Sequence, residues 1–225
     1  MSKKSNLPTK GISEKRAFSM PDMQASEEGN VIQGHAAVFG QTTNMYGCWN
    51  ETIARGAFDK TDFTNVLFSI NHDLDEIPLA RSRNNNANST LQLQVDDQGL
   101  NTRAVLDIEN NGAAKALYGS VSRGDMDGMS FIFSVGDDEW TGLDTDMPSR
   151  TILTIRKVFE VSAVSFPAYT GTDLTARDAT ALESAKAVLE SARAKELESS
   201  SEQRNQELSR ELELLKLKNQ NKMKG

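Results

Sequence analysis

The uneven distribution of residue types along the chain is the sequence feature that most limits its possible folds. All 14 aromatic residues lie at or before Tyr169, and all five prolines lie at or before Pro167. Between Thr172 and Lys224 there is no glycine, proline or aromatic residue. Aromatic side chains dominate packed cores, and tight turns depend on glycine and proline. The sequence therefore predicts a globular part that ends near residue 171 and a tail of a different kind.

The charge of the chain follows the same division. The whole chain has 32 acidic and 25 basic residues, a formal net charge of −7. Residues 1–20 hold five bases and one acid, residues 21–171 hold 21 acids and ten bases, and residues 172–225 hold ten of each. The acid excess of the central part argues against a nucleic-acid-binding surface. No apolar run approaches the roughly 20 residues that span a bilayer, so no membrane role is expected either.

Residues that ligate metals or form disulfides are rare in this sequence. The chain has one cysteine, Cys48, and two histidines, His35 and His72. A single cysteine cannot form a disulfide within the chain, which is typical of a reducing compartment. Structural zinc sites use four ligands that are mostly cysteine and histidine. We therefore predict no metal and no cofactor.

Composition predicts three segments. Residues 1–27 are polar and basic and are predicted as a flexible arm, with a docking or cleavable segment as the alternative. No apolar stretch follows the first basic residues, so a secretory signal is not expected. Residues 28–175 are predicted as the globular domain, and residues 176–225 as a helical tail.

Alternation and turn signals predict a mainly β fold for the central segment. Residues 91–95 alternate apolar and polar side chains, residues 96–99 form a turn, and residues 100–108 return as a hairpin partner. A short helix is predicted over residues 113–122, with an asparagine before it as cap. Further strands are predicted at residues 31–39, 65–70, 129–135, 150–159 and 161–166. Six or seven short strands with few helices favour a small barrel or closed sheet.

The tail has the apolar spacing of an amphipathic helix. Apolar residues recur every three or four positions: Ala181, Ala185, Val188 and Ala192, and later Leu208, Leu212 and Leu215. Three serines at residues 199–201 are expected to interrupt the helix. A solvated helix or weak coiled coil explains this pattern, and a partner-binding or scaffold-like tail is the alternative.

Three polar residues of the central segment have the chemistry of a hydrolytic site. Ser130 opens a predicted strand after a glycine-rich loop, residues 124–128, whose backbone N–H groups are candidate oxyanion donors. His72 directly follows another strand, and an imidazole is the base that activates a serine. Glu160 interrupts an apolar stretch, and a carboxylate fixes the tautomer of an imidazole. Taken singly, the same residues fit an ordinary turn, a surface histidine and a solvent-facing acid.

Together and in this order, these residues resemble the prohead (capsid maturation) protease family of tailed phages, over about residues 31–177. The matching pieces are Gly34 to Phe39, Arg55-Gly56-Ala57-Phe58, Asn71-His72-Asp73 with Pro78-Leu79-Ala80-Arg81, Arg123-Gly124-Asp125 with Gly128-Met129-Ser130-Phe131, and Glu160-Val161-Ser162 with Pro167-Ala168-Tyr169. Each piece is short, and their order and spacing carry the resemblance.

The resemblance implies a fold and a set of catalytic residues. The family is similar in fold to herpesvirus maturation proteases, so it implies an α+β, mainly β domain: a closed β-barrel with surrounding helices. It implies Ser130 as the nucleophile, His72 as the general base and Glu160 as the third, orienting member. Herpesvirus relatives use a second histidine as third member, which makes His35 a competing candidate, although its place within a strand favours a structural role. Arg150 is implied as a residue that positions an oxyanion-stabilising water.

The resemblance also implies a function. It predicts a serine endopeptidase that cleaves the scaffolding segment of the major capsid protein, or a separate scaffold protein, and itself. The predicted location is the host cytoplasm, inside the immature prohead. The tail is predicted to dock on capsid or scaffold protein, and self-association through it is a further possibility. The alternatives are a fused protease and scaffold, a non-catalytic capsid assembly protein, and a binding module with no phage role.

Overall fold

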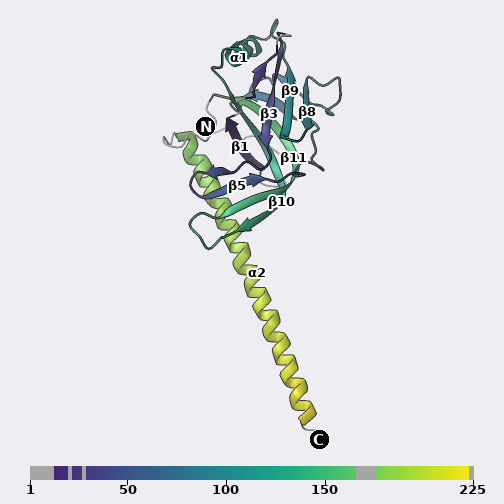
Figure 1. Cartoon of the computed structure of the whole chain (residues 1–225), viewed down its shortest axis with the longest axis vertical. Coiled ribbons are helices and arrows are strands. Elements are labelled where there is room, and N and C mark those ends of the chain that lie inside the picture. The colour runs from purple at the N-terminus through teal and green to yellow at the C-terminus, as the bar shows by residue number, and fades with distance from the viewer. Residues whose placement is uncertain (1–12, 20–21, 27–28, 166–175, 223–225) are drawn as a thin grey trace.

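The computed structural model describes residues 13–19, 22–26, 29–165 and 176–222. These residues form two β-sheets, a short helix and one very long helix. Figure 1 shows the strands gathered at one end of the molecule, with the long helix running along this body and projecting away from it. The mainly β, α+β character predicted from the sequence is confirmed.

The larger sheet carries most of the long strands. Its strand order is β1 (Ser13–Ser19), β10 (Gly128–Thr141), β11 (Ser149–Val164), β5 (Trp49–Ile53) and β4 (Thr43–Met45). Strand β6 (Leu67–Ile70) also pairs with β11, and β7 (Ala80–Arg81) pairs with β6. β11 runs parallel to β5 and β6 and antiparallel to β10. β1 lies within residues 1–27, the range predicted as an arm.

The smaller sheet and the short helix match the sequence prediction closely. The sheet has the order β2 (Gln24–Ala25), β3 (Val31–Val38), β9 (Gly99–Val105) and β8 (Leu91–Val95). The predicted hairpin is confirmed as β8 and β9. Helix α1 (Gly112–Ser122) begins after Asn111, whose side chain accepts hydrogen bonds from two backbone N–H groups of the first turn.

The prediction of a closed β-barrel with surrounding helices is wrong. The larger sheet is open and has β1 and β4 at its ends, and the smaller sheet ends at β2 and β8. Within the described residues, no strand pairing joins the two sheets. Alternation identifies the buried face of a strand, but every strand edge offers the same N–H and C=O groups, so the pattern does not say where a sheet stops.

One hydrophobic core joins the two sheets and α1. It includes fully buried aromatic side chains from the loop after β5 and from strands β6 and β10, namely Phe58, Phe68, Phe131 and Phe133. Burying one such side chain stabilises the fold by roughly 1.5–3 kcal/mol. Leu117 of α1 belongs to the same core. This core supports the face of β10 opposite to Ser130.

Strand β11 is longer than predicted. A break was expected at Glu160, yet the strand runs from residue 149 to 164 without interruption. The carboxylate is buried, but it accepts hydrogen bonds from neighbouring hydroxyl groups and faces an imidazole nitrogen. Because a satisfied buried acid need not turn toward water, the strand continues past it.

The long helix α2 (Ala176–Lys222) is also continuous where a break was expected. The hydroxyl groups of Ser199 and Ser201 donate to the carbonyl oxygens of Glu196 and Glu198, three residues earlier. The serines are thereby satisfied inside the helix. Neither helix of the described residues has the length and apolar character to cross a membrane.

The first half of α2 is anchored to the body of the protein. Ala185 and Leu189 pack with Met45, Trp49 and Leu143 in a second hydrophobic cluster. The Arg193 guanidinium donates to the carbonyl oxygens of Leu143 and Thr145 over 2.9 and 3.0 Å. Beyond these contacts, the helix projects from the body (Figure 1).

Candidate active site

Three serines lie in a row across three neighbouring strands of the larger sheet. Ser130 of β10 is the register partner of Ser162 of β11, and Ser162 is the register partner of Ser69 of β6. All three side chains are buried. Glu160 precedes Ser162 by two residues, so both side chains lie on the same face of β11. The sheet pairing thus brings Ser69 and Ser130 together with Glu160 and Ser162 of β11, although Ser69 lies far from the other three in the sequence.

A strained turn places His72 over this row. Asn71 and His72 follow β6 directly, and both adopt left-handed backbone conformations, with φ of 51° and 60°. Asparagine and histidine tolerate this region better than most residues. The turn is anchored because the Asn71 N–H donates to the carbonyl oxygen of Ala163, and the His72 N–H donates to Ser162 Oγ. Such strain is typical of functional sites.

The imidazole of His72 lies between the serine and the glutamate. Its Nε2 is 2.6 Å from Ser130 Oγ, and its Nδ1 is 2.7 Å from Glu160 Oε2. Both separations are hydrogen-bond distances. The structure therefore brings together the three residues that the sequence analysis selected, in the order serine, histidine, carboxylate.

Two further serines hold Glu160, and sequence reasoning missed them. Ser69 Oγ and Ser162 Oγ both donate to Glu160 Oε1, while His72 occupies Oε2. Only 1% of the glutamate surface is exposed, so the carboxylate depends on these partners to remain in the sheet. The sequence signal for Ser162 is its i, i+2 spacing from Glu160 within a strand, which places both side chains on one face.

His35, the competing third member, lies elsewhere. It belongs to β3 of the smaller sheet, where its Nδ1 is 2.5 Å from Asp22 Oδ2 and its Nε2 is 2.9 Å from Asp96 Oδ2. Both ring nitrogens are therefore engaged by carboxylates. Burial alone would lower the pKa of His35, but the hydrogen bonds to the two aspartates outweigh burial and raise the pKa above its usual value. This arrangement ties residue 22 to the β8–β9 turn.

The His35 ion pairs predict a pH-dependent stability. A raised folded-state pKa gives stabilisation that is complete below the unfolded value of 6.5 and is lost as the pH rises through the folded pKa. The pKa of Asp96 is lowered, because hydrogen bonds from Gly99 and His35 outweigh the opposing effect of burial. The stabilisation that Asp96 contributes is therefore lost as the pH falls below about 3.8. His35→Asn is expected to lower the unfolding free energy by about 1–2 kcal/mol near pH 5.5 and by less at pH 8.5.

Urea unfolding of both proteins at the two pH values measures this difference. NMR titration of the His35 ring protons gives its pKa directly, and the Asp22→Asn variant should lower that pKa. A stability difference that stays constant from pH 5.5 to 8.5 would contradict the proposed ion pairs.

Arg150 does not contact the proposed catalytic residues, and two N–H groups of the glycine-rich loop are engaged elsewhere. The Arg150 guanidinium is buried and binds Glu14, Glu51 and Asp138, and no hydrogen bond joins it to Ser130 or His72 in the described part of the chain. In the loop, the N–H groups of Gly124 and Asp125 donate to carbonyl oxygens at the end of α1. These donors are therefore already used.

The nucleophile candidate has a contact that the sequence did not indicate. Ser130 Oγ donates to the carbonyl oxygen of Arg16 in β1 over 2.7 Å, and no part of Ser130 is exposed.

Within the described residues, no group of three histidine, cysteine, aspartate or glutamate side chains is placed to hold a metal ion.

Comparison with known proteins decides the family. A family model described as caudovirus prohead serine protease matches residues 18–191. The chain belongs to this family. The chain is 28% identical over 158 residues to a relative, the prohead protease of Enterobacteria phage HK97. That match covers 68% of this chain and 63% of the HK97 protein, which is less than two thirds of its length. No solved structure matches significantly.

The range matched by the caudovirus prohead serine protease family contains every residue of the serine row. It begins within β1 and ends within α2, at the point where the helix is packed against the body. The projecting part of α2 lies outside the matched range.

Proposed function

We propose that this protein is a serine endopeptidase of the phage prohead, with Ser130 as nucleophile, His72 as general base and Glu160 as the orienting acid. The observation that carries the proposal is the hydrogen-bonded chain from Ser130 through His72 to Glu160 in a member of a serine protease family. A base within 2.6–3.2 Å of a hydroxyl, itself oriented by a third group, is the arrangement that activates a serine.

The reaction follows from these contacts. Ser130 Oγ attacks the carbonyl carbon of a peptide bond while His72 Nε2 accepts the hydroxyl proton. Glu160 accepts the Nδ1–H hydrogen bond, which keeps Nε2 free as the base and stabilises the imidazolium that forms. His72 then donates its proton to the leaving amine. A water molecule, activated by His72, hydrolyses the acyl-enzyme and restores Ser130.

Ser69 and Ser162 are positioning residues in this proposal. Their hydroxyl groups donate to Glu160 Oε1 and leave Oε2 for the imidazole. Ser162 also accepts the backbone N–H of His72 over 3.0 Å, so one hydroxyl fixes both the acid and the turn that carries the base.

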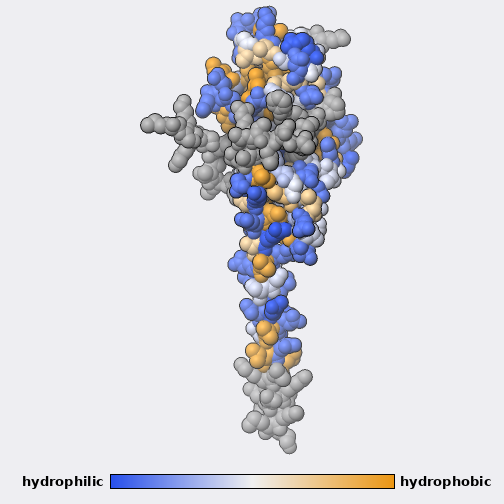
Figure 2. Space-filling model, turned by 90° about the vertical axis from the view of Figure 1, so that its left-hand side faces the viewer, coloured by the Kyte–Doolittle hydropathy of each residue, from blue (hydrophilic) through white to orange (hydrophobic). Residues whose placement is uncertain are grey.

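The proposed substrates are the scaffolding segment of the capsid protein or a separate scaffold protein, and the protease itself, inside the immature prohead. We also propose the division into residues 1–27, 28–175 and 176–225, in which β1 and β2 of the first segment complete the sheets of the second and the tail is the delivery segment. Figure 2 shows hydrophobic patches spaced along the projecting helix. Among the side chains described there, the exposed large apolar ones are Leu197, Leu208, Leu212 and Leu214. Exposed leucines on a helix favour a helical partner, either capsid or scaffold protein or a second copy of α2. They also keep a fused protease and scaffold as the second candidate.

Co-expression with the capsid and scaffold proteins of the same phage tests both the activity and the tail. The full-length protein should yield shortened capsid or scaffold chains. A variant that ends at residue 195 keeps the contacts of Ala185, Leu189 and Arg193 and removes the exposed leucines. We expect it to fold and to be lost from purified proheads. Mass spectrometry of the particles measures cleavage and protease content together.

Two outcomes would contradict this proposal separately. Capsid and scaffold chains that stay at full length with the wild-type protein would overturn the protease function. Unchanged incorporation of the variant that ends at residue 195 would overturn the delivery role of the tail and leave the protease function in place.

A further inference from the structure

The N-terminal strand β1 covers the proposed nucleophile. β1 is an end strand of the larger sheet, and it pairs antiparallel with β10 so that Ala17 lies opposite Ser130. Ser130 has no exposed surface, and the Arg16 carbonyl oxygen lies 2.7 Å from its Oγ. A substrate peptide bond therefore cannot reach Ser130 Oγ while β1 is in this place.

The contact with β1 also directs the hydroxyl proton away from the base. Ser130 Oγ carries one proton, and two acceptors are within reach: the Arg16 carbonyl oxygen at 2.7 Å and His72 Nε2 at 2.6 Å. General-base catalysis needs the proton to pass to His72. A proton donated to Arg16 is not on that path. β1 thus excludes the substrate and engages the group that His72 must activate.

The edge of β10 beneath β1 is suited to bind an extended peptide. Residues 128–134 pair with β11 on one side and with β1 on the other. Without β1, this edge presents unpaired backbone N–H and C=O groups beside Ser130. Proteins recognise extended peptides by adding them as a strand to such an edge.

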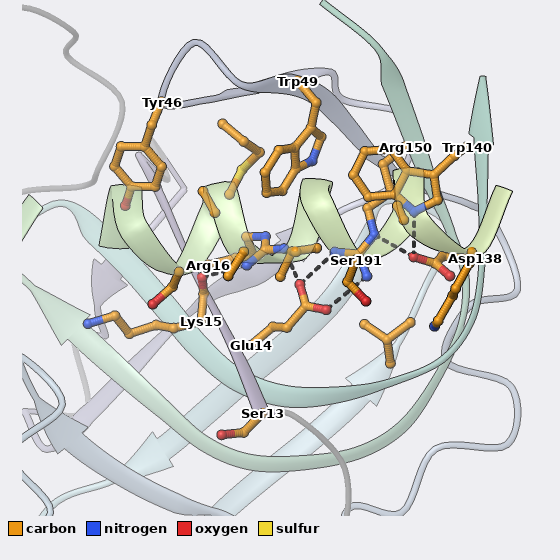
Figure 3. A pocket seen from close by; sticks show the side chains of 18 of the residues that line it. Ser13, Glu14, Lys15, Arg16, Tyr46, Trp49, Asp138, Trp140, Arg150 and Ser191 are labelled. Atoms are coloured by element: carbon orange, nitrogen blue, oxygen red, sulfur yellow. Dashed lines mark hydrogen bonds and ion pairs between the residues drawn. The ribbon is translucent and has the colours of Figure 1, made fainter. Parts of the chain in front are cut away.

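Buried ion pairs hold β1, and their partners on the body also pair with each other. Glu14 binds Arg150 over 2.6 and 2.8 Å (Figure 3), and Arg16 binds Glu51 over 2.8 Å. β1 therefore contributes one acid and one base. Arg150 and Glu51 also pair with each other over 3.1 Å, so the departure of β1 leaves neither as an unpaired buried charge. A pocket of about 860 Å³ lies against Glu14 and Arg16, between β1 and α2.

We propose that β1 is an intramolecular blocking strand on the substrate-binding edge of β10, and that the substrate replaces it in the same register. This inference rests on the proposed role of Ser130. The fitting substrate is an extended segment with a basic residue in the place of Arg16, facing Glu51, and an acidic residue two positions earlier, facing Arg150. Water hydrolyses the bond between the basic residue's carbonyl carbon and the next nitrogen, giving a carboxylate and an amine.

A reversible lock on β1 tests the blocking role. Ser13 and Ser134 are register partners across β1 and β10, so Ser13→Cys with Ser134→Cys joins the strands when oxidised; Cys48→Ser removes the native thiol. The readout is the rate at which a small fluorophosphonate labels Ser130. We expect labelling to be about tenfold or more slower in the oxidised protein than after reduction, because only the open population reacts.

The matched control places the same lock where β1 is not involved. Gln92 and Arg103 are register partners across β8 and β9, and their double cysteine variant should be labelled at equal rates when oxidised and reduced. In the opposite direction, Glu14→Gln removes the Arg150 ion pair and should increase the labelling rate about threefold or more. Equal rates in the locked and reduced protein, together with no increase in Glu14→Gln, overturn the proposal.

Two peptides test the substrate class. One carries the β1 order, an acid two positions before a base at the cleaved bond, and the other exchanges these two residues. The first should be cleaved with a kcat/KM about tenfold higher than the second. Equal values overturn the charge assignment.

Failure of this inference remains separate from failure of the proposed function. If the lock has no effect but Ser130→Ala stops cleavage, only the blocking role falls, whereas cleavage by Ser130→Ala removes the nucleophile itself.

Discussion

Replacing Ser130 with alanine is expected to lower kcat for peptide cleavage about 10⁶-fold, the size of loss seen when a serine nucleophile is removed from a catalytic triad. The substitution removes the attacking oxygen and leaves the base without a proton to accept. Ser130 is buried beside Ala17 in a well-paired strand, so the smaller side chain should leave the fold intact. The measurement is single-turnover cleavage of a peptide that spans a mapped capsid cleavage site.

The matched control is Ser134→Ala. Ser134 lies on the same strand, four residues further along, and its side chain is also buried. Because no hydrogen bond joins it to His72 among the described residues, its loss should leave kcat unchanged. Cleavage by Ser130→Ala at the wild-type rate would remove Ser130 from the role of nucleophile, whatever the other variants do.

Replacing Glu160 with glutamine is expected to lower kcat about 10⁴-fold. A glutamine amide donates to His72 Nδ1 instead of accepting from it. The imidazole then carries its proton on Nε2 and cannot accept the proton of Ser130. Glutamine has nearly the same size and shape as glutamate. Circular dichroism and the unfolding midpoint show separately whether the variant keeps its fold. The rate is measured with the same peptide.

The competing histidine provides the control for this second prediction. His35→Asn removes the other imidazole, whose nitrogens are engaged by Asp22 and Asp96, and should leave kcat unchanged. A large loss in His35→Asn with a small loss in Glu160→Gln would assign the third role to His35. Glu160→Asp should retain more activity than Glu160→Gln, because it keeps the charge and changes only the reach.

The sequence predicts the polar site better than it predicts the arrangement of strands. His72 and Ser130 are recognisable because His72 follows an apolar run and Ser130 precedes one, at positions where a sheet presents side chains. The hairpin of β8 and β9 and the cap of α1 follow from local signals. Closure of the sheet depends on which edges meet, and that is a long-range property with no local signature.

The contacts that the sequence did not predict have a common cause. Ser69 becomes a partner of Glu160 only through the parallel pairing of β6 with β11. Arg16 reaches Ser130 only because β1 adds to β10 from a segment that composition marks as polar. In both cases the strand partner lies more than 90 residues away. Sequence periodicity identifies faces, whereas pairing over such distances is decided by the packed fold.

In its proposed delivery role, the unbroken second half of α2 would set a distance between the protease and its partner. From Arg193, which hydrogen-bonds to the body, to Lys222, the helix extends about 45 Å at 1.5 Å per residue. A flexible linker of the same number of residues would let the catalytic centre sample every distance up to full extension. A stiff arm instead holds whatever it grips at one separation from Ser130. In the proposed delivery role, the distance from the bound partner would then decide which of many chemically similar peptide bonds Ser130 can reach.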